Sequence, residues 1–385
     1  VVSHWEDKGT WSPFSHRAYQ LVYNSVNPEL RSASRLGKVT DLSFQNLRLD
    51  LDDCVALGQL KSLRTLELYR VTVPSDGWQY LGQLFGLMSV TLLEVRIDET
   101  GVVALAQMPS LSYFWASDTE FRLSQELNFK AFTALQEATF VNCQMEPGFL
   151  AVIADAPLER LEMLECQFSD HAFAYLSELK ALRSLWLVTD MPGLLVSEVL
   201  PSLQRLRSVK LYIGSHADEV CQSLATLPNL MEVQINVSRN IGVGDIGLKH
   251  LTELKGLTTL AVDAERVTDV GAEYVGSCSS LRVLRLDNSQ ISDKGLYAIA
   301  RLPELSKLFI PGSRITDHGM KAVVSCNTLR ILDVSRTKIT DQGLEYIKDC
   351  RSLQVLYIRE TGVSRQGITT LKRWRPDLAV VSDSH

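Results

Sequence analysis

The chain has 385 residues, of which 45% are hydrophobic and 22% are charged. No run of about 18 apolar residues occurs, so the sequence predicts no membrane span. The formal net charge of −6 gives no sign of a nucleic-acid-binding protein. Seven cysteines without paired-motif spacing give no sign of a disulfide framework and favour a reducing compartment.

Residues 1–38 precede a repeating pattern and are rich in aromatic side chains. They contain Trp5, Trp11, Phe14, Tyr19 and Tyr23. We predict that this segment is a cap that covers the apolar end of the first repeat. The alternative is a docking segment for another chain.

From residue 39 to about residue 378, the pattern L-x-x-L-x-L returns with a nearly constant period. Eleven of the thirteen steps share one length, while the step from Leu135 is one position shorter and the step from Leu230 is three positions longer. The common step of about 24 residues lies within the range of about 20–29 residues that, with this pattern, is typical of a solenoid of stacked units. The fourteen units start at Val39, Leu63, Leu87, Leu111, Leu135, Leu158, Leu182, Leu206, Leu230, Leu257, Leu281, Leu305, Leu329 and Leu353.

Each unit is predicted to contain a short strand, a turn and a short helix. In LRVLRL at 281–286, the last two leucines are two residues apart and therefore point to one face of a strand. Ser/Thr-Asp-x-Gly follows the strand, as at 340–343, and predicts a helix start, because the hydroxyl caps free N–H groups and the carboxylate suits the helix dipole. Apolar residues at helical spacing come next, for example Leu344 and Ile347. No unit can bury its apolar face alone, so we expect one long parallel sheet on the inner curve and helices outside it.

Residues 242–247 match G-x-G-x-x-G between a predicted strand and a predicted helix, and Asp263 follows at the end of the next predicted strand. This arrangement is typical of a dinucleotide-binding site. The repeat gives a competing interpretation, since Asp245 and Gly247 also fall on the recurring Asp and Gly once three extra residues are allowed for. We therefore predict no cofactor, no metal and no catalytic residue, and a nucleotide-dependent enzyme is the alternative.

Strand residues that alternate with the core leucines are predicted to point out of the inner, concave face. Large aromatic side chains there offer anchors for a partner, because Trp, Tyr and Arg dominate binding hot spots. The structural alternative is that these aromatics follow β-propensity and pack on their neighbours. The candidate partner-binding residues are Glu67, Tyr69, Tyr113, Trp115, Glu137, Glu162, Trp186, Tyr212, Arg285, Phe309, Asp333, Tyr357 and Arg359.

The signature is clearest in VTDVGA at 267–272, ISDKGL at 291–296, ITDHGM at 315–320 and ITDQGL at 339–344. Cys278, Cys326 and Cys350 share one position before the next unit. On these residues the chain resembles the leucine-rich-repeat family, in the I-T-D-x-G-L, cysteine-containing subtype found in F-box proteins and bacterial repeat proteins. The resemblance implies an α/β fold: a right-handed leucine-rich-repeat solenoid, or horseshoe, with a parallel concave sheet and short convex helices.

Two features are uneven along the chain. The units that start at 63, 111, 182 and 206 lack the T-D-x-G signature, so we expect irregular helices in the first half. Residues 257–385 hold 18 Lys and Arg against 15 Asp and Glu, a net charge of +3, whereas the remainder holds 21 against 30, a net charge of −9. This asymmetry suggests that the two ends of the arc favour different partners.

The predicted organisation is a capping segment (1–38), a solenoid of about fourteen repeats (39–378) and a C-terminal tail (379–385). The family resemblance implies a binding scaffold with many roles, so we predict a non-enzymatic protein-protein interaction scaffold that holds a protein or peptide, and no nucleic acid, on its concave face. The alternatives are a substrate-recognition adaptor of a ubiquitin-ligase-like complex and a structural subunit of a larger assembly. We expect a cytoplasmic protein. Because the chain starts at Val1, the alternative is an exported or anchored protein whose signal was removed.

Overall fold

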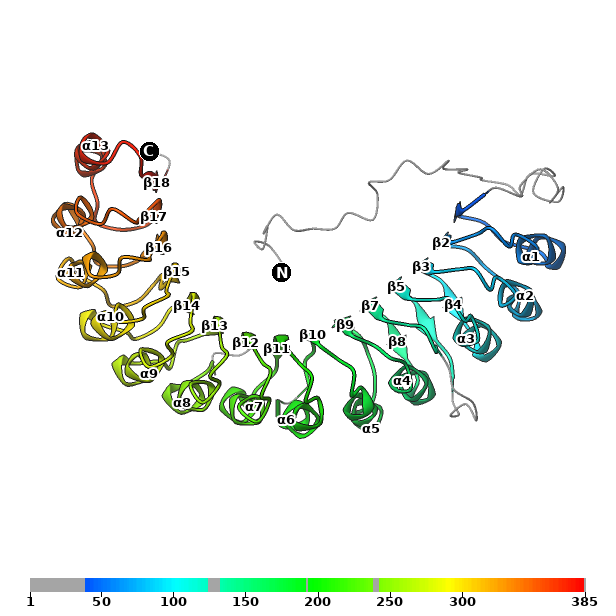
Figure 1. Ribbon diagram of the computed structural model, residues 1–385. Helices are drawn as coiled ribbons and strands as arrows, with labels where there is room; N and C mark the ends of the chain where they lie inside the picture. Colours follow the sequence, from blue (N-terminus) through cyan, green and yellow to red (C-terminus); the bar gives the residue numbers. More distant parts are fainter. Residues whose placement is uncertain (1–38, 124–131, 192, 238–241, 384–385) are drawn as a thin grey trace.

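The computed structural model describes residues 39–123, 132–191, 193–237 and 242–383, so the predicted cap at 1–38 lies outside the described residues. Strands and helices alternate along a single curved stack (Figure 1). Within these residues, fifteen parallel strands form one sheet in sequence order on the inner side of the arc, and the helices lie on its outer side. The predicted solenoid with a concave sheet and convex helices is therefore confirmed.

Each strand between the two ends of the main sheet pairs with the strands of the units before and after it, so equivalent leucines lie side by side, as Leu284 and Leu308 do. Residues 379–381, which were placed in the predicted tail, form the last strand of this sheet beside Val355–Tyr357. The strands of the main sheet are β1 (Asp41–Gln45), β2 (Thr65–Tyr69), β3 (Ser89–Leu93), β5 (Tyr113–Ser117), β7 (Glu137–Val141), β9 (Arg160–Leu164), β10 (Ser184–Val188), β11 (Ser208–Ile213), β12 (Glu232–Val237), β13 (Thr259–Asp263), β14 (Val283–Asp287), β15 (Lys307–Phe309), β16 (Ile331–Asp333), β17 (Val355–Tyr357) and β18 (Ala379–Val381). A small parallel sheet contains β4 (Arg96–Ile97), β6 (Glu120–Phe121) and β8 (Gln144–Met145).

The convex side carries short helices, most of them of two turns. Their bounds are α1 (Leu51–Gly58), α2 (Ser75–Leu81), α3 (Glu99–Ala106), α4 (Pro147–Ala154), α5 (Asp170–Phe173), α6 (Gly193–Val199), α7 (Ala217–Leu224), α8 (Asp245–Leu251), α9 (Asp269–Val275), α10 (Asp293–Ile299), α11 (Met320–Val324), α12 (Asp341–Ile347) and α13 (Arg365–Trp374). Two 3₁₀ segments, η2 (Ala174–Glu178) and η3 (Leu200–Ser202), follow α5 and α6.

The expectation of irregular helices holds for only part of the first half. The unit that starts at 182 contains the helix α6 followed by η3, and residues 124–131 of the unit that starts at 111 lie outside the described residues. The units that start at 63 and 206 contain the regular helices α2 and α7, so the prediction was wrong there. Neither helix has a side-chain cap at its start. Their buried apolar residues, such as Trp78 in α2 and Val220 in α7, stabilise them through packing instead.

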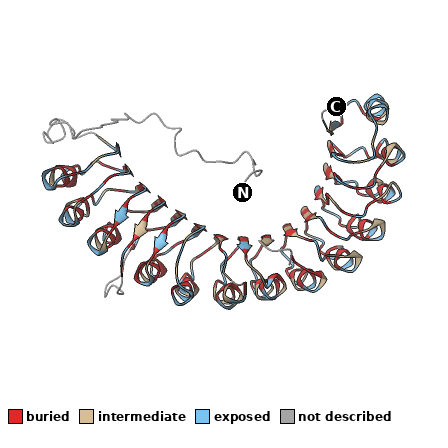
Figure 2. Ribbon diagram, turned by 180° about the vertical axis from the view of Figure 1, so that it is seen from behind, coloured by how far each residue is buried: buried red, intermediate tan, exposed pale blue. Residues whose placement is uncertain are grey.

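The core lies between the sheet and the helices, where Figure 2 shows buried residues along the whole arc. In the first half it contains a phenylalanine cluster, which we define as Phe114, Phe121, Phe132, Phe140 and Phe149. Phe121 stacks on Phe149 with 4.1 Å between ring centroids, and Phe114 and Phe140 each meet it edge-on at 5.8 Å. These rings come from the two successive units that start at Leu111 and Leu135, so the cluster joins these units to each other.

In the second half, an aspartate clamp joins each unit to the next. The Asp of one T-D-x-G signature accepts hydrogen bonds from the backbone N–H and the hydroxyl of the following unit's Ser or Thr, at N–O distances of 2.7–2.8 Å and O–O distances of 2.6–2.7 Å. The expected helix-start role belongs to the hydroxyl, because Thr268 Oγ1 accepts from the N–H of Val270. The clamp pairs are Asp245–Thr268, Asp269–Ser292, Asp293–Thr316, Asp317–Thr340 and Asp341–Ser364.

The clamp also explains the glycine of the signature. The N–H of Gly295 donates to Asp269 Oδ1 at 3.0 Å, and a Cβ on Gly295 would lie 2.5 Å from that oxygen. Real Cβ atoms do not approach oxygen that closely, so a larger residue displaces the carboxylate. In the unit that starts at Leu305 the clamp is present, but residues 317–319 form a turn and α11 begins only at Met320 rather than at the predicted Asp317.

The seven cysteines are free thiols, and all but Cys166 are buried. Burial raises the pKa of both Cys54 and Cys278 to about 11. Such thiols stay protonated at neutral pH and behave as small core side chains.

Candidate functional site

The concave face presents three parallel rows of outward-pointing side chains, because equivalent strand positions stack in register. The central row runs without a gap through Trp115, Thr139, Glu162, Trp186 and Lys210. Neighbouring strands lie about 4.8 Å apart, so adjacent members of a row are within contact distance. All thirteen predicted residues are half-buried or exposed, and none of them belongs to the core.

The structure divides the predicted residues among these rows. Tyr113 and Glu137 lie in the first row, whereas Tyr69 and Tyr212 lie in the third row. Arg359 is exposed and follows the end of β17. The central row holds Glu67, Trp115, Glu162, Trp186, Arg285, Phe309, Asp333 and Tyr357.

The N-terminal half of the face carries an acidic-aromatic patch, defined as Glu67, Tyr69, Tyr113, Trp115, Glu137 and Glu162. Burial, with a further contribution from Glu67, raises the pKa of Tyr69 to about 12. Burial also raises the pKa of Tyr113, and the charges of Glu162 and Glu137 add to the effect. Arg160, at 3.7 Å from Glu137, is the cation that pairs with this patch within the described residues. The patch therefore carries a net negative charge.

The middle of the face has its most exposed aromatic side chains. Trp186 is 37% exposed and Tyr212 is 39% exposed. The Lys210 ammonium lies 5.1 Å from the centre of the Trp186 ring, in cation–π geometry. The prediction missed Lys210, although it follows Trp186 by one repeat length and so occupies the same strand position.

The C-terminal half of the face is mixed in charge. The Arg285 guanidinium lies 5.5 Å from the centre of the Phe309 ring and forms an ion pair with Asp287 at 2.9 Å. Burial raises the pKa of Asp287 above its usual 3.8, and Asp263 and Asp333 add to the rise, against the lowering effect of Arg285.

We expect Asp287→Asn to raise the free energy of unfolding at pH 7. A carboxyl whose pKa is higher in the folded state than in the unfolded state destabilises the fold when ionised, and this cost disappears as the pH falls through the folded-state pKa. The variant's gain in free energy of unfolding should therefore be present at pH 7 and vanish well below pH 3.8, the ordinary pKa of Asp. Urea unfolding at both pH values measures it. A variant less stable than the parent at pH 7 would show that the ion pair with Arg285 outweighs burial.

The glycine motif at 242–247 is packed against neighbouring units. The N–H of Gly244 donates to Asp218 Oδ1 at 2.8 Å, and a Cβ on Gly247 would lie 2.4 Å from the same oxygen. A Cβ on Gly242 would lie 2.3 Å from the carbonyl oxygen of Asp263. These glycines thus allow close stacking of units, and Asp218 occupies the place at the helix start where a nucleotide phosphate would bind.

Two further observations concern other kinds of site. Within the described ranges, no group of three or more His, Cys, Asp or Glu side chains is arranged to hold a metal ion. No helix in this part of the chain has the length and hydrophobicity needed to span a bilayer.

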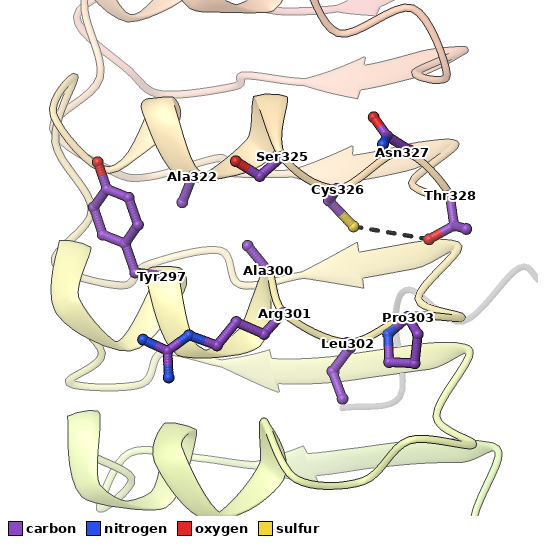
Figure 3. Close-up of a pocket in the computed structure, with 10 residues that line it drawn as sticks. All are labelled: Tyr297, Ala300, Arg301, Leu302, Pro303, Ala322, Ser325, Cys326, Asn327 and Thr328. Atoms are coloured by element: carbon purple, nitrogen blue, oxygen red, sulfur yellow. Dashed lines mark hydrogen bonds between the residues drawn. The ribbon is translucent and has the colours of Figure 1, made fainter.

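The C-terminal units have two adjoining hollows on the edge where the strands begin. One, of about 560 Å³, lies between the ends of α10 and α11 and is lined by Tyr297, Arg301 and Cys326 among others (Figure 3). The other, of about 760 Å³, lies over the loops that lead into β15, β16 and β17. Pro303, Asn327 and Thr328 line both hollows and separate them.

Two segments, 277–300 and 325–348, match the family profile described as Leucine Rich repeat. Each segment covers one period, which agrees with the repeat length in the sequence. No curated protein matches the chain.

Solved structures with the same fold are similar over most of this chain. A leucine-rich-repeat protein from Leptospira interrogans has a TM-score of 0.59 at 16% identity, covering 96% of each chain. An internalin from Listeria monocytogenes has a TM-score of 0.56 at 17% identity, covering 84% of this chain and 88% of its own. A third structure is the ectodomain of the Arabidopsis thaliana membrane receptor kinase GASSHO1/SCHENGEN3, solved in complex with CASPARIAN STRIP INTEGRITY FACTOR 2. Its TM-score is 0.55 at 16% identity, and the match covers 95% of this chain and 43% of that chain. These likenesses establish a leucine-rich-repeat solenoid fold.

Proposed function

We propose that this leucine-rich-repeat solenoid is a non-enzymatic scaffold that binds a protein partner on its concave face. The observation that carries the proposal is the unbroken central row from Trp115 to Lys210, which places two tryptophans, a carboxylate and an ammonium side by side. Solenoids offer extended concave surfaces of this kind to their partners. The receptor kinase ectodomain, solved with its bound factor, is an example of a ligand complex on the same fold.

The exposure of the aromatic side chains supports binding over packing. Trp186 and Tyr212 lie in adjacent strands and keep more than a third of their surface open. Aromatic rings of this size contribute strongly when a partner covers them, since they bring large apolar area with few rotatable bonds. β-Propensity alone does not call for aromatic side chains at these positions, because smaller β-branched residues satisfy it as well.

The charge of the acidic-aromatic patch indicates the chemistry of the partner. Glu67 and Glu162 point into the same face as Trp115, and Arg160 is the cation paired with the patch in the described part of the chain. A partner segment with Lys or Arg next to apolar side chains would find both carboxylates and cation–π surfaces there. We therefore propose a basic, partly apolar segment of a protein as the ligand of this patch, and no nucleic acid, because phosphates would meet a negative surface.

The test removes both tryptophans of the central row. We expect Trp115→Ala and Trp186→Ala each to weaken binding of the partner about tenfold, because each ring buried at an interface contributes a kcal/mol or more. The partner is first identified by affinity purification from native extract and mass spectrometry, and its affinity for each variant is then measured by calorimetric titration.

Trp374→Ala is the matched control, because Trp374 lies in the convex helix α13 and is 44% exposed. Binding to this variant should equal binding to the parent. An unchanged affinity of the Trp115/Trp186 double variant, with both variants folded, would remove the concave face as the binding surface.

The narrower predictions from the sequence stay proposals. Cys278, Cys326 and Cys350 all occupy buried positions before the next unit, which supports assignment to the cysteine-containing subtype. The adaptor and structural-subunit roles would use the same fold with different partners. Purification of the partner distinguishes them, since an adaptor should co-purify with ligase components and a structural subunit with a fixed assembly.

A further inference from the structure

The larger hollow at the strand-start edge is built from three successive loops. It is lined by the residues that immediately precede β15, β16 and β17, namely Ser306, Arg330 and Gln354, together with Arg282 and Arg351. Its position at the edge of the sheet separates it from the rows of the concave face. A ligand bound there would not need the tryptophans of the central row.

The ion pairs around this hollow leave a positive excess. Arg282 is paired with Glu304 at 2.9 Å. Asp377 is paired with Arg375 at 2.8 Å, and Arg375 is only 1% exposed. Hydrogen bonds from Arg375 lower the pKa of Asp377, so this carboxylate is ionised and already neutralised.

Arg330 and Arg351 are exposed and form no ion pair within the described residues. The two carboxylates of the hollow, Glu304 and Asp377, are thus already paired. The guanidinium groups of Arg330 and Arg351 line the same hollow and remain open to solvent. The charge of Arg351 also helps to lower the pKa of Asp377, but without forming an ion pair. Two exposed arginines without an ion pair in a concave site of about 760 Å³ attract anions more strongly than the same charges on a flat surface.

We propose that this arginine hollow, defined by Arg282, Arg330 and Arg351, binds an acidic segment of a partner protein through its side-chain carboxylates. Arginine–carboxylate pairing already occurs at the hollow, because Arg282 pairs with Glu304 and Arg375 pairs with Asp377. The adjoining hollow in Figure 3 extends the surface with Ala300, Leu302 and Pro303, which suits an apolar side chain next to the acidic ones. In that view Arg301 extends away from Cys326 and adds another cation at the outer end.

The proposal agrees with the charge distribution of the chain. Residues 257–385 carry a net charge of +3 and the remainder carries −9, so an acidic segment is attracted to this end and repelled by the other. The arginine hollow and the acidic-aromatic patch thus select opposite charges. A phosphate group could also occupy two arginines, so the test separates phosphate from carboxylate.

The test uses the full chain and a fluorescein-labelled hexaglutamate peptide, with binding followed by fluorescence anisotropy at low salt, about 50 mM, and again at about 300 mM. We expect saturable binding that weakens with salt and falls about tenfold or more in the variant with Arg330→Glu and Arg351→Glu. Lys338→Glu is the matched control, because Lys338 is exposed in the same unit as Arg330 but lies beyond the opposite end of β16. Binding to this control should stay within about twofold of the parent.

Two other ligands complete the test. A peptide with phosphoserine in place of one glutamate, and inorganic phosphate as a competitor, should bind no better than hexaglutamate itself. Selective binding of phosphate, equal losses in the Lys338→Glu control and in the double variant, or no saturable binding at low salt would each overturn the proposal. None of these outcomes bears on the Trp115/Trp186 test, because the two surfaces share no residue.

Discussion

Phe121→Ala should lower the free energy of unfolding by about 4 kcal/mol, since removal of a fully buried Phe typically costs about 3–5 kcal/mol. Phe121 is fully buried and contacts Phe114, Phe140 and Phe149, so its loss leaves a cavity at the junction of two units. In a stack whose stability depends on interfaces between neighbours, such a defect also uncouples the units on either side. Urea unfolding should therefore show both a lower midpoint and a broader transition.

Phe85→Ala is the control for the same substitution. Phe85 is 58% exposed, and its recorded ring contact is the Lys61 ammonium at 5.6 Å. Its replacement should cost less than about 1 kcal/mol. A similar loss in both variants would mean that the phenylalanine cluster contributes no more than a surface ring.

Gly295→Ala should lower the free energy of unfolding by about 3 kcal/mol, because it removes charge-assisted hydrogen bonds as well as creating a clash. The new Cβ would lie 2.5 Å from Asp269 Oδ1 and 2.7 Å from Ile291 Cγ2. The carboxylate would have to leave the N–H of Ser292, its hydroxyl and the N–H of Gly295, from which it now accepts at 2.8, 2.6 and 3.0 Å. Thermal and urea unfolding measure the loss.

Two variants identify the clamp as the cause. Asp269→Ala removes the same hydrogen bonds without the clash and should lose most of the same stability. Gly256→Ala is the matched control, because the nearest atom to its new Cβ is the carbonyl oxygen of Leu230 at 3.8 Å. It should change stability by no more than about 0.5 kcal/mol. If Asp269→Ala were as stable as the parent, steric contact alone would explain the glycine.

Most of the fold follows from local spacing in the sequence. Leu66 and Leu68 are buried and Glu67 between them points out, as the two-residue strand period predicts. The aspartate clamp was not predicted, because the sequence shows only that Asp recurs before Gly. The partner of Asp269 is Ser292 in the following unit, and such a contact depends on the exact rise from one unit to the next. The late start of α11 likewise depends on local turn geometry.

The candidate site was also predictable in part. The outward positions of Trp115 and Trp186 follow from the alternation of the strands. Lys210 was missed because Lys is not among the residue types that dominate binding hot spots, although the repeat length places it beside Trp186. The arginine hollow could not be predicted, because Arg330 and Arg351 lie near opposite ends of one unit in the sequence, and only the shapes of the loops bring both to the same hollow.

The aspartate clamp has a consequence for how the length of this protein can change. Each clamp aspartate from Asp245 to Asp341 meets the same chemical groups in the following unit, so removal or duplication of one whole repeat there recreates the original contacts at the new seam. The phenylalanine cluster has no such interchangeable parts, since Phe114 and Phe140 lie opposite Ala138 and Ala116 in the neighbouring strand and not at equivalent positions. Insertions and deletions of whole repeats should thus be tolerated in the C-terminal half of the arc. The arc can lengthen or shorten there without any other change in sequence.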